Sequence, residues 1–244
     1  LEQIWHGRVK MAIQTIAPIR ISHSLAVTLS VCAAILLAGA SFARAGDLNP
    51  PAGPVAPTHK TLTEVEPRIA INATNTPGDA DSLFKIIAPG SYYLTGNITG
   101  VVGKHGVEIA AGGSGVTLDL NGFDLVGVAG SLDGVSVTVV GLTNIAVING
   151  SVRNWGNDGV DLGTFATFNC RIEGVGTSGN IGNGILAGGA STVANCSASF
   201  NSASGISTGA GSTVTHCSTF QNTLSGINSG QGGSVANCAA VLNI

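Results

Sequence analysis

Short runs of alternating apolar and polar residues fill the C-terminal part of the chain and recur at a constant interval. Ser191-Thr-Val-Ala-Asn-Cys196 is followed 21 residues later by Ser212-Thr-Val-Thr-His-Cys217, and after 21 more by Gly233-Ser-Val-Ala-Asn-Cys238. Alternation over four to six residues is typical of a β-strand, and the intervening Gly, Ser and Asn clusters are typical of turns. A constant period of this length indicates stacked repeats, each burying its apolar face against the next.

These features predict a parallel β-solenoid, in which each strand lies about 4.8 Å from its counterpart one coil away. No repeat contains an apolar run long enough for a helix. A leucine-rich repeat has a similar period but needs several leucines per unit, whereas Leu224 is the only leucine between Ser191 and Val241. A calcium-binding nonapeptide roll needs regularly placed Asp, and this region has none.

A Gly-Val or Gly-Ile step extends the repeat towards the N-terminus. The successive intervals are 28, 25, 25, 21 and 21 residues, which predicts about six coils of 21–28 residues over 95–244. Since no capping segment follows the last repeat, we expect this β-helix to be truncated at its C-terminus. The steps begin at Gly106, Gly134, Gly159, Gly184, Gly205 and Gly226.

Asparagines form a second regular feature, and we expect them to be structural. Asn tolerates the left-handed conformation of tight turns, and stacked amides hydrogen-bond from coil to coil. Aligning Asn169 with Asn195 places five extra residues in a loop within 174–183, and such insertions often lie on a binding face. The proposed column comprises Asn97, Asn121, Asn149, Asn169, Asn195, His216 and Asn237, and Asn201, Asn222 and Asn243 form another.

The same alignment stacks Cys170, Cys196, Cys217 and Cys238 in one column. Their Cα atoms would lie within reach of a disulfide, but parallel Cα–Cβ bonds on adjacent coils suit that bond poorly. A linear column also lacks the convergent ligands of a zinc site. We therefore predict free, buried thiols that fill the core, with disulfides as the alternative in an exported protein.

Two segments in the middle of the chain resemble a known class of proteins. Gly115-Val-Thr-Leu-Asp-Leu-Asn-Gly-Phe123 and Asn144-Ile-Ala-Val-Ile-Asn-Gly-Ser-Val-Arg-Asn154 are similar to segments of secreted bacterial right-handed parallel β-helix proteins, the pectate-lyase-like superfamily. The resemblance covers about 94–244 and implies an all-β, right-handed parallel β-helix. It implies no particular activity, because lyases, hydrolases, epimerases and proteins without known activity share that fold.

The N-terminal part predicts an export leader. After Met11, an apolar run over 25–40 and then Ala43-Arg-Ala45 have the pattern of a secretory signal peptide and its cleavage site. We therefore expect 1–45 to be an upstream extension plus signal peptide and the mature chain to start near Gly46. An uncleaved membrane anchor is the alternative.

Two further segments precede the repeats. Residues 46–67 are rich in proline and predict an extended linker. Residues 68–94 hold short apolar runs separated by turn residues, and they predict an N-terminal cap region that covers the strand edge of the first coil.

Charge is scarce and unevenly distributed. Charged residues make up 9 % of the chain, the net charge is −3, and no basic patch with interleaved aromatics is present, so nucleic acid is excluded as a partner. No Asp, Glu, Lys or Arg occurs from Gly174 to Ile244. Acid–base catalysis needs titratable groups. An active site would therefore lie mainly between Lys104 and Glu173.

One alignment in those coils points to a candidate site. His105, Asp133 and Asp158 each directly precede the glycine of a repeat. Two residues after that glycine stand Glu108 in the first of these coils and Asp161 in the third. In register, Asp133 and Asp158 lie about 5 Å apart. Such carboxylates raise one another's pKa or bind Ca²⁺, which suits a glycoside hydrolase or a calcium-assisted lyase. Solvated turn residues are the alternative.

Arg153 and Arg171 are candidates for the base or the carboxylate-binding cation of a uronate lyase. Neither lies in the Arg-x-Pro-x-x-Arg pattern of pectate lyases, and the Asn-Thr-Asp, Asp-Asp and Gly-His-Gly set of polygalacturonases is missing. Trp155, next to Arg153, is a candidate to stack on a sugar ring or to cover a coil edge.

We therefore predict a secreted or cell-surface β-helix module, with the periplasm as an alternative location, that binds polysaccharide or a cell-surface glycan without catalysis. The alternative is a polysaccharide lyase or glycoside hydrolase acting on a uronate-containing glycan. The only cofactor predicted is Ca²⁺ at Asp133 and Asp158, and no membrane span is expected in the mature chain.

Overall fold

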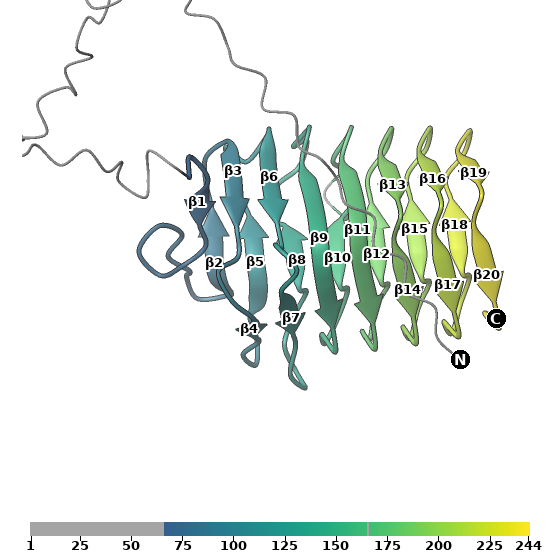
Figure 1. Ribbon diagram of the computed structural model, residues 1–244, viewed down its shortest axis with the longest axis horizontal. Coiled ribbons are helices and arrows are strands. Elements are labelled where there is room, and N and C mark those ends of the chain that lie inside the picture. Colours follow the sequence, from purple (N-terminus) through teal and green to yellow (C-terminus); the bar gives the residue numbers. More distant parts are fainter. Residues whose placement is uncertain (1–65, 165) are drawn as a thin grey trace, which may run out of the picture. The chain divides into compact units, whose positions relative to one another are not determined.

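A computed structural model describes residues 66–164 and 166–244, and these residues form parallel strands that wind into a solenoid (Figure 1). They contain no helix, and their strands belong to one sheet of 13 strands and one of seven. The structure therefore confirms an all-β parallel β-helix. The predicted leader and most of the predicted linker lie outside the described residues.

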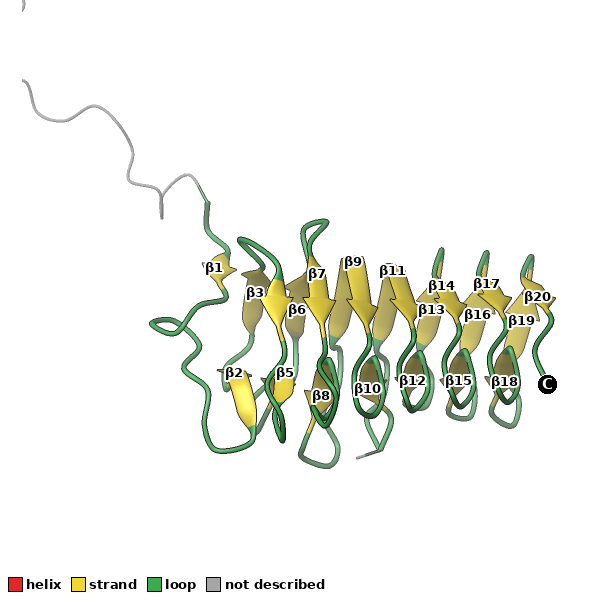
Figure 2. Cartoon of the chain, turned by 90° about the horizontal axis from the view of Figure 1, so that it is seen from below, coloured by secondary structure: helices red, strands yellow, loops and turns green. Residues whose placement is uncertain are grey.

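Each coil contributes strands to as many as three rows, and the third row is separate from the other two (Figure 2). The first row contains β1 (Ile69–Ala70), β3 (Gly90–Tyr93), β6 (Val116–Asp119), β9 (Ala146–Arg153), β11 (Arg171–Ser178), β13 (Thr192–Ala194), β16 (Thr213–Thr215) and β19 (Ser234–Ala236). The second row contains β4 (Ile98–Thr99), β7 (Asp124–Val126), β14 (Ser197–Ser199), β17 (Ser218–Phe220) and β20 (Ala239–Val241), and the long strands β9 and β11 extend into it. The third row contains β2 (Ser82–Ile86), β5 (His105–Ile109), β8 (Val135–Val137), β10 (Val160–Leu162), β12 (Ile185–Ala187), β15 (Ile206–Thr208) and β18 (Ile227–Ser229).

The first row delimits about seven coils, one more than the sequence predicts. The difference arises within 68–94, where β1 pairs with β3 and β2 pairs with β5 in the same parallel sheets. From β5 onwards the paired residues keep the predicted intervals of 28, 25, 25, 21 and 21, as in Val107–Val135 and Ile206–Ile227.

The core is a set of inward-facing columns, one residue per coil. First-row strands such as β6 and β13 alternate between buried and more exposed side chains. Leu118, Val147, Ile172 and Val193 of this row lie level with one another and are 0 % exposed. Trp155 also lies in the core, is 0 % exposed, and donates a hydrogen bond from Nε1 to the Leu125 carbonyl oxygen at 3.1 Å. It is therefore a packing residue and presents no ring face to a sugar.

The Gly-Val and Gly-Ile steps have a steric cause. A Cβ added to Gly134 would lie 2.6 Å from the carbonyl oxygen of Gly159, and one added to Gly184 would lie 2.6 Å from that of Gly205. Contacts below 3.0 Å are not tolerated against backbone atoms. Glycine therefore recurs because the next coil occupies the space of a side chain.

Residues with positive φ mark the corners of the coils and correct one part of the sequence alignment. Asn149 and Asn195 have φ near 58° and 54°, as expected for left-handed turns, but Gly174, with φ of 63°, stands between them in register. Asn169 instead lies level with Asn144, at a different corner. The prediction of one shared column was wrong because both corners require the same left-handed backbone.

Two consequences follow from that shift of five residues. Cys170 lies level with Ser191. The residue level with Cys196 on the preceding coil is therefore Val175 and not Cys170. The extra residues of this coil lie between Leu162 and the Phe168 bridge, because Leu162 pairs with Ala187 while Phe168 pairs with Gly189. They do not form a loop within 174–183.

The cysteines of the described residues are all free thiols, as predicted, but the prediction that Cys170 shares the column of the other three was wrong. Cys170, Cys196 and Cys217 are buried, and Cys238 is partly exposed. The thiols of Cys196 and Cys217 each donate to the carbonyl oxygen two residues earlier, at 3.2 Å. Cys196 and Cys217 lie in one column and fill the core there as small apolar groups.

A buried ladder of asparagines joins the C-terminal coils. The Oδ1 of Asn201 accepts hydrogen bonds from the backbone N and the Nδ2 of Asn180, at 3.1 and 2.9 Å, and Asn222 and Asn243 repeat the arrangement. Asn180 and Asn201 are 0 % exposed. This confirms that stacked amides hydrogen-bond from coil to coil.

Replacing Asn201 should therefore destabilise the solenoid strongly. Asn201→Ala leaves the buried backbone N–H of Asn180 without an acceptor and removes the amide–amide bonds to Asn180 and Asn222, so we expect a loss of about 3 kcal/mol in the free energy of unfolding. Urea denaturation followed by circular dichroism measures this loss. Ser202→Ala, at an exposed neighbour, serves as the control. Equal stabilities of the two variants would contradict the structural role of the ladder.

Candidate functional site

The third row brings together the candidate residues that the sequence aligns. His105 begins β5, and Asp133 and Asp158 precede β8 and β10 at the equivalent position, because Val107, Val135 and Val160 pair in register. The Nδ1 atom of His105 lies 3.1 Å from the Oδ2 of Asp133. The predicted juxtaposition of these three residues on successive coils is present in the structure.

Their hydrogen bonds form a ladder that runs along the coil edge. The backbone N of Asp158 donates to Asp133 Oδ1 at 2.8 Å, and the Nδ2 of Asn183 donates to Asp158 Oδ1 at 3.1 Å, as does the Asn183 backbone N. One coil further, the Ser204 backbone N donates to Asn183 Oδ1 at 3.2 Å. An amide thus replaces the carboxylate at an equivalent position, which indicates that coil-to-coil bonding is the common role of this column.

Asp161 bonds to the turn that directly follows its own strand, β10. Its Oδ1 accepts hydrogen bonds from the backbone N atoms of Gly163 and Thr164, both at 2.9 Å, and so stabilises the turn that follows the strand. Its register partners on the preceding coils are Ser136 and Glu108, as the sequence alignment predicts. The carboxylate lies near those of Asp133 and Asp158 but is bonded to its own turn.

Burial sets the electrostatics of this group. Asp133, Asp158 and Asp161 are 3 %, 5 % and 4 % exposed. Burial raises the pKa of Asp158 to about 6, and the charges of Asp161 and Asp133 add to the effect. Burial lowers the pKa of His105, but the hydrogen bond and charge of Asp133 outweigh it, so the net shift is upward. The group can hold a proton near neutral pH, yet it offers little surface to a polymer.

Arg153 and Arg171 lie in the other sheet, and each is engaged by an acid there. Arg153 Nε and Nη2 both donate to Asp124 Oδ2 at 3.1 Å, and Arg171 Nη1 lies 2.5 Å from Glu173 Oε2. The structure therefore does not bring Arg153 into the His105–Asp133–Asp158 group.

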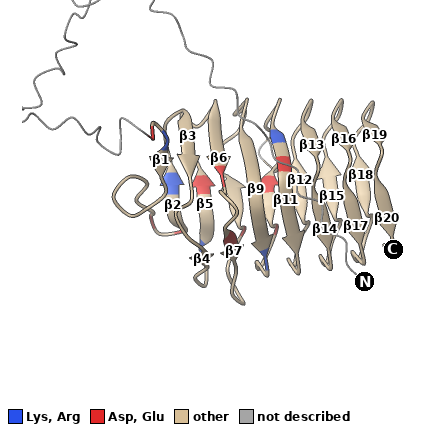
Figure 3. Cartoon of the chain, viewed as in Figure 1, with Lys and Arg blue, Asp and Glu red and all other residues tan. Residues whose placement is uncertain are grey.

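The highest concentration of ionised groups lies on the N-terminal coils, as Figure 3 shows, and the coils beyond β11 carry none. Around β2 and β5, Lys85 Nζ lies 2.6 Å from Asp79 Oδ2 and 2.9 Å from Glu108 Oε1. The sequence alignment noted Glu108 but not its partners. The one available signal was Asp79-Ala-Asp81-Ser82, a turn with two closely spaced acids.

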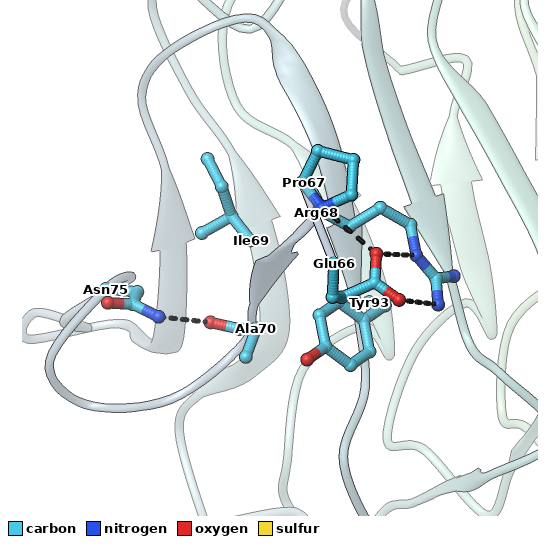
Figure 4. A pocket seen from close by; sticks show the side chains of 7 residues that line it. All are labelled: Glu66, Pro67, Arg68, Ile69, Ala70, Asn75 and Tyr93. Atoms are coloured by element: carbon cyan, nitrogen blue, oxygen red, sulfur yellow. Dashed lines mark hydrogen bonds and ion pairs between the residues drawn. The ribbon is translucent and has the colours of Figure 1, made fainter. Parts of the chain in front are cut away.

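A small cavity of about 300 Å³ beside β1 is lined by charged and aromatic groups (Figure 4). Arg68 donates from Nε and Nη2 to both carboxylate oxygens of Glu66 and from Nη1 to Asp119, and its guanidinium lies 4.6 Å from the centre of the Tyr93 ring. Since the Arg68 guanidinium is paired with two carboxylates and covers one face of the Tyr93 ring, the cavity offers no unpaired cation to a ligand.

Comparison with protein-family models, with curated proteins and with solved structures finds no match for this chain. Among the described residues, no helix has the length and apolar character needed to cross a membrane. The predicted leader over 25–40 lies outside those residues.

The raised pKa of Asp158 predicts a pH-dependent stability. The folded protein binds this proton more tightly than the unfolded chain, whose Asp titrates near its ordinary value of 3.8. Stability therefore falls as pH rises from about 4 to about 6, by roughly 3 kcal/mol at most. Asp158→Asn, which keeps an acceptor oxygen, should remove this decline in urea unfolding at a series of pH values.

Ser204→Ala provides the matched control, because Ser204 holds the same place two coils further on and is not titratable. It should keep the wild-type pH profile. Parallel profiles for wild type and Asp158→Asn would contradict the assignment.

Proposed function

We propose that this protein is a secreted or cell-surface β-helix module that binds a neutral polysaccharide and does not catalyse a reaction on it. The observation that carries the proposal is a pair of exposed phenylalanine rings on coils that carry no charge. The export leader predicted from the sequence supports the location outside the cytoplasm.

The rings of Phe200 and Phe220 meet edge to face, with centroids 5.5 Å apart and planes at 84°. They are 57 % and 37 % exposed. Phe200 stands at a corner where the backbone is left-handed on the neighbouring coils too, since Gly179 and Gln221, level with it, have φ of 65° and 50°. Two adjoining apolar rings exposed to solvent are unfavourable for stability, and exposed apolar groups that cluster mark binding surfaces.

The surroundings of the two rings suit a sugar. Ser178 and Ser199 lie level with Phe220 on the preceding coils, so hydroxyl groups continue the row in which the ring stands. Aromatic faces pack against the C–H groups of a pyranose, and hydroxyls exchange hydrogen bonds with its O–H groups. With no Lys or Arg from Gly174 onwards, nothing on these coils would pair with a uronate carboxylate. A neutral glycan is therefore the better fit.

Removing the rings should weaken binding without unfolding the protein. For the mature chain from Gly46, we expect Phe200→Ala/Phe220→Ala to bind neutral polysaccharide about tenfold more weakly, which corresponds to about 1.4 kcal/mol. Affinity gel electrophoresis with neutral and uronate-containing polysaccharides measures the retention.

Val140→Ala, at a residue 75 % exposed beyond β8, is the matched control and should bind as wild type does. Thermal unfolding verifies that both variants fold. Unchanged retention of the double phenylalanine variant, or preferential binding of uronate polymers, would refute the proposal.

A polysaccharide lyase or glycoside hydrolase is the second candidate, favoured by the pKa of about 6 at Asp158, which suits a general acid. Under the binding proposal, wild-type protein releases no unsaturated products or reducing ends from the same polysaccharides, with or without Ca²⁺. Asp133→Asn/Asp158→Asn then retains full glycan binding. Product release that the double Asn variant abolishes would replace the binding module by an enzyme.

A further inference from the structure

Three carboxylates converge where the first two strands of the third row begin. Asp79 and Asp81 lie in the turn that precedes β2, and Glu108 projects from β5. One oxygen from each lies within 4.8 Å of the others. Asp79 and Asp81 are exposed, whereas Glu108 is only 2 % exposed, so the cluster has a solvent side and a buried floor.

The buried floor contains an oxygen without a partner. Glu108 Oε1 accepts a hydrogen bond from Thr138 Oγ1 at 2.5 Å and lies 2.9 Å from Lys85 Nζ. Glu108 Oε2 is buried and has no hydrogen-bond partner among the described residues. A buried carboxylate oxygen is costly when unsatisfied, and buried charges are stabilised by pairing or by metal coordination. This observation is independent of the clustering of the acids.

The turn itself offers further oxygens. The main-chain carbonyls of Asp79 and Ser82 both accept hydrogen bonds from Lys104 Nζ. The groups of this turn that face cations are thus carboxylate and carbonyl oxygens, and the three clustered ligands include neither His nor Cys. Oxygen-only ligand sets at a flexible turn are typical of Ca²⁺, whereas zinc prefers nitrogen and sulfur.

The ammonium of Lys85 competes with a bound cation for the carboxylates of this cluster. This ammonium lies 2.6 Å from Asp79 Oδ2 as well as beside Glu108, so it neutralises part of the cluster. The side chain is 27 % exposed and extends from the strand edge, and it can turn into solvent when a divalent ion takes its place. Lys85 and Lys104 together balance two of the three carboxylates, and displacement of Lys85 leaves the cluster with two net negative charges for a divalent cation.

We propose that Asp79, Asp81 and Glu108 bind a divalent cation of the Ca²⁺ class and that Lys85 is displaced when it binds. The ion connects β5 with the turn that precedes β2, and it thereby holds the first coil to the second. This site is distinct from the Ca²⁺ site predicted at Asp133 and Asp158, since it is formed by other residues, on the first two coils. It is also independent of the glycan-binding proposal, since it lies on other coils.

Isothermal titration of the mature chain with CaCl₂, after treatment with a chelator, tests the proposal. Wild-type protein should bind one Ca²⁺ and show a higher midpoint of thermal unfolding in its presence. Asp81→Asn, at an exposed position, should weaken binding at least tenfold while the protein remains folded. Glu108→Gln should do the same and retains an acceptor for Thr138.

Lys85→Met gives the discriminating result, because loss of the competing ammonium should tighten Ca²⁺ binding severalfold. Asp124→Asn, an acid in the other sheet, and Asp133→Asn/Asp158→Asn are the matched controls and should bind as wild type does. Absence of Ca²⁺ binding by wild type at millimolar concentration would overturn the proposal. So would binding that Asp81→Asn leaves unchanged, that Lys85→Met fails to tighten, or that only Asp133→Asn/Asp158→Asn abolishes.

Discussion

Main-chain hydrogen bonding between residues one coil apart is the constraint on which the rest of this structure depends. Every strand finds its partners about 4.8 Å away in the next coil, so each side chain has its equivalent directly above and below it. Where the coil turns sharply, the carbonyl of the next coil takes the space of a side chain, as at Gly134 and Gly184. At the corners the backbone must be left-handed, and Asn or Gly supplies it at most of them, with residues such as Phe200 and Gln221 at others.

The same stacking limits which polar groups the coils can bury. A carboxylate stacked on another carboxylate repels it, unless backbone donors from the next coil occupy its oxygens. Asp133 and Asp158 meet this condition through the N–H groups of Asp158 and Asn183. Burial is the main cause of the raised pKa of Asp158, and the remaining repulsion adds to it. Further along the column Asn183 makes the same kind of bond without charge. The loss of charge towards the C-terminus therefore leaves coil-to-coil bonding intact.

The sequence predicts most of the fold and part of the candidate site, for reasons that the register makes plain. The glycine steps were reliable because no other residue fits them, and they aligned His105 with Asp133 correctly. Asn169 was misplaced because two corners demand the same backbone and a single sequence does not distinguish them. The partners of Glu108 were missed because Lys85 and Asp79 lie in a coil with no repeat signal, where pairing depends on three-dimensional contact alone.

The N-terminal and C-terminal coils present two different kinds of surface along the solenoid. The N-terminal coils vary in length, and their ionised side chains meet across coils 23 to 28 residues long, so turns such as that of Asp79–Ser82 can gather groups around a charge. The C-terminal coils have a constant 21-residue period, which repeats the same small hydroxyl groups at the strand spacing. The proposed neutral glycan is a ligand that is itself periodic and uncharged, as this surface is. Phe200 and Phe220, the exposed aromatic pair on that surface, supply the local contact area that a row of serines lacks.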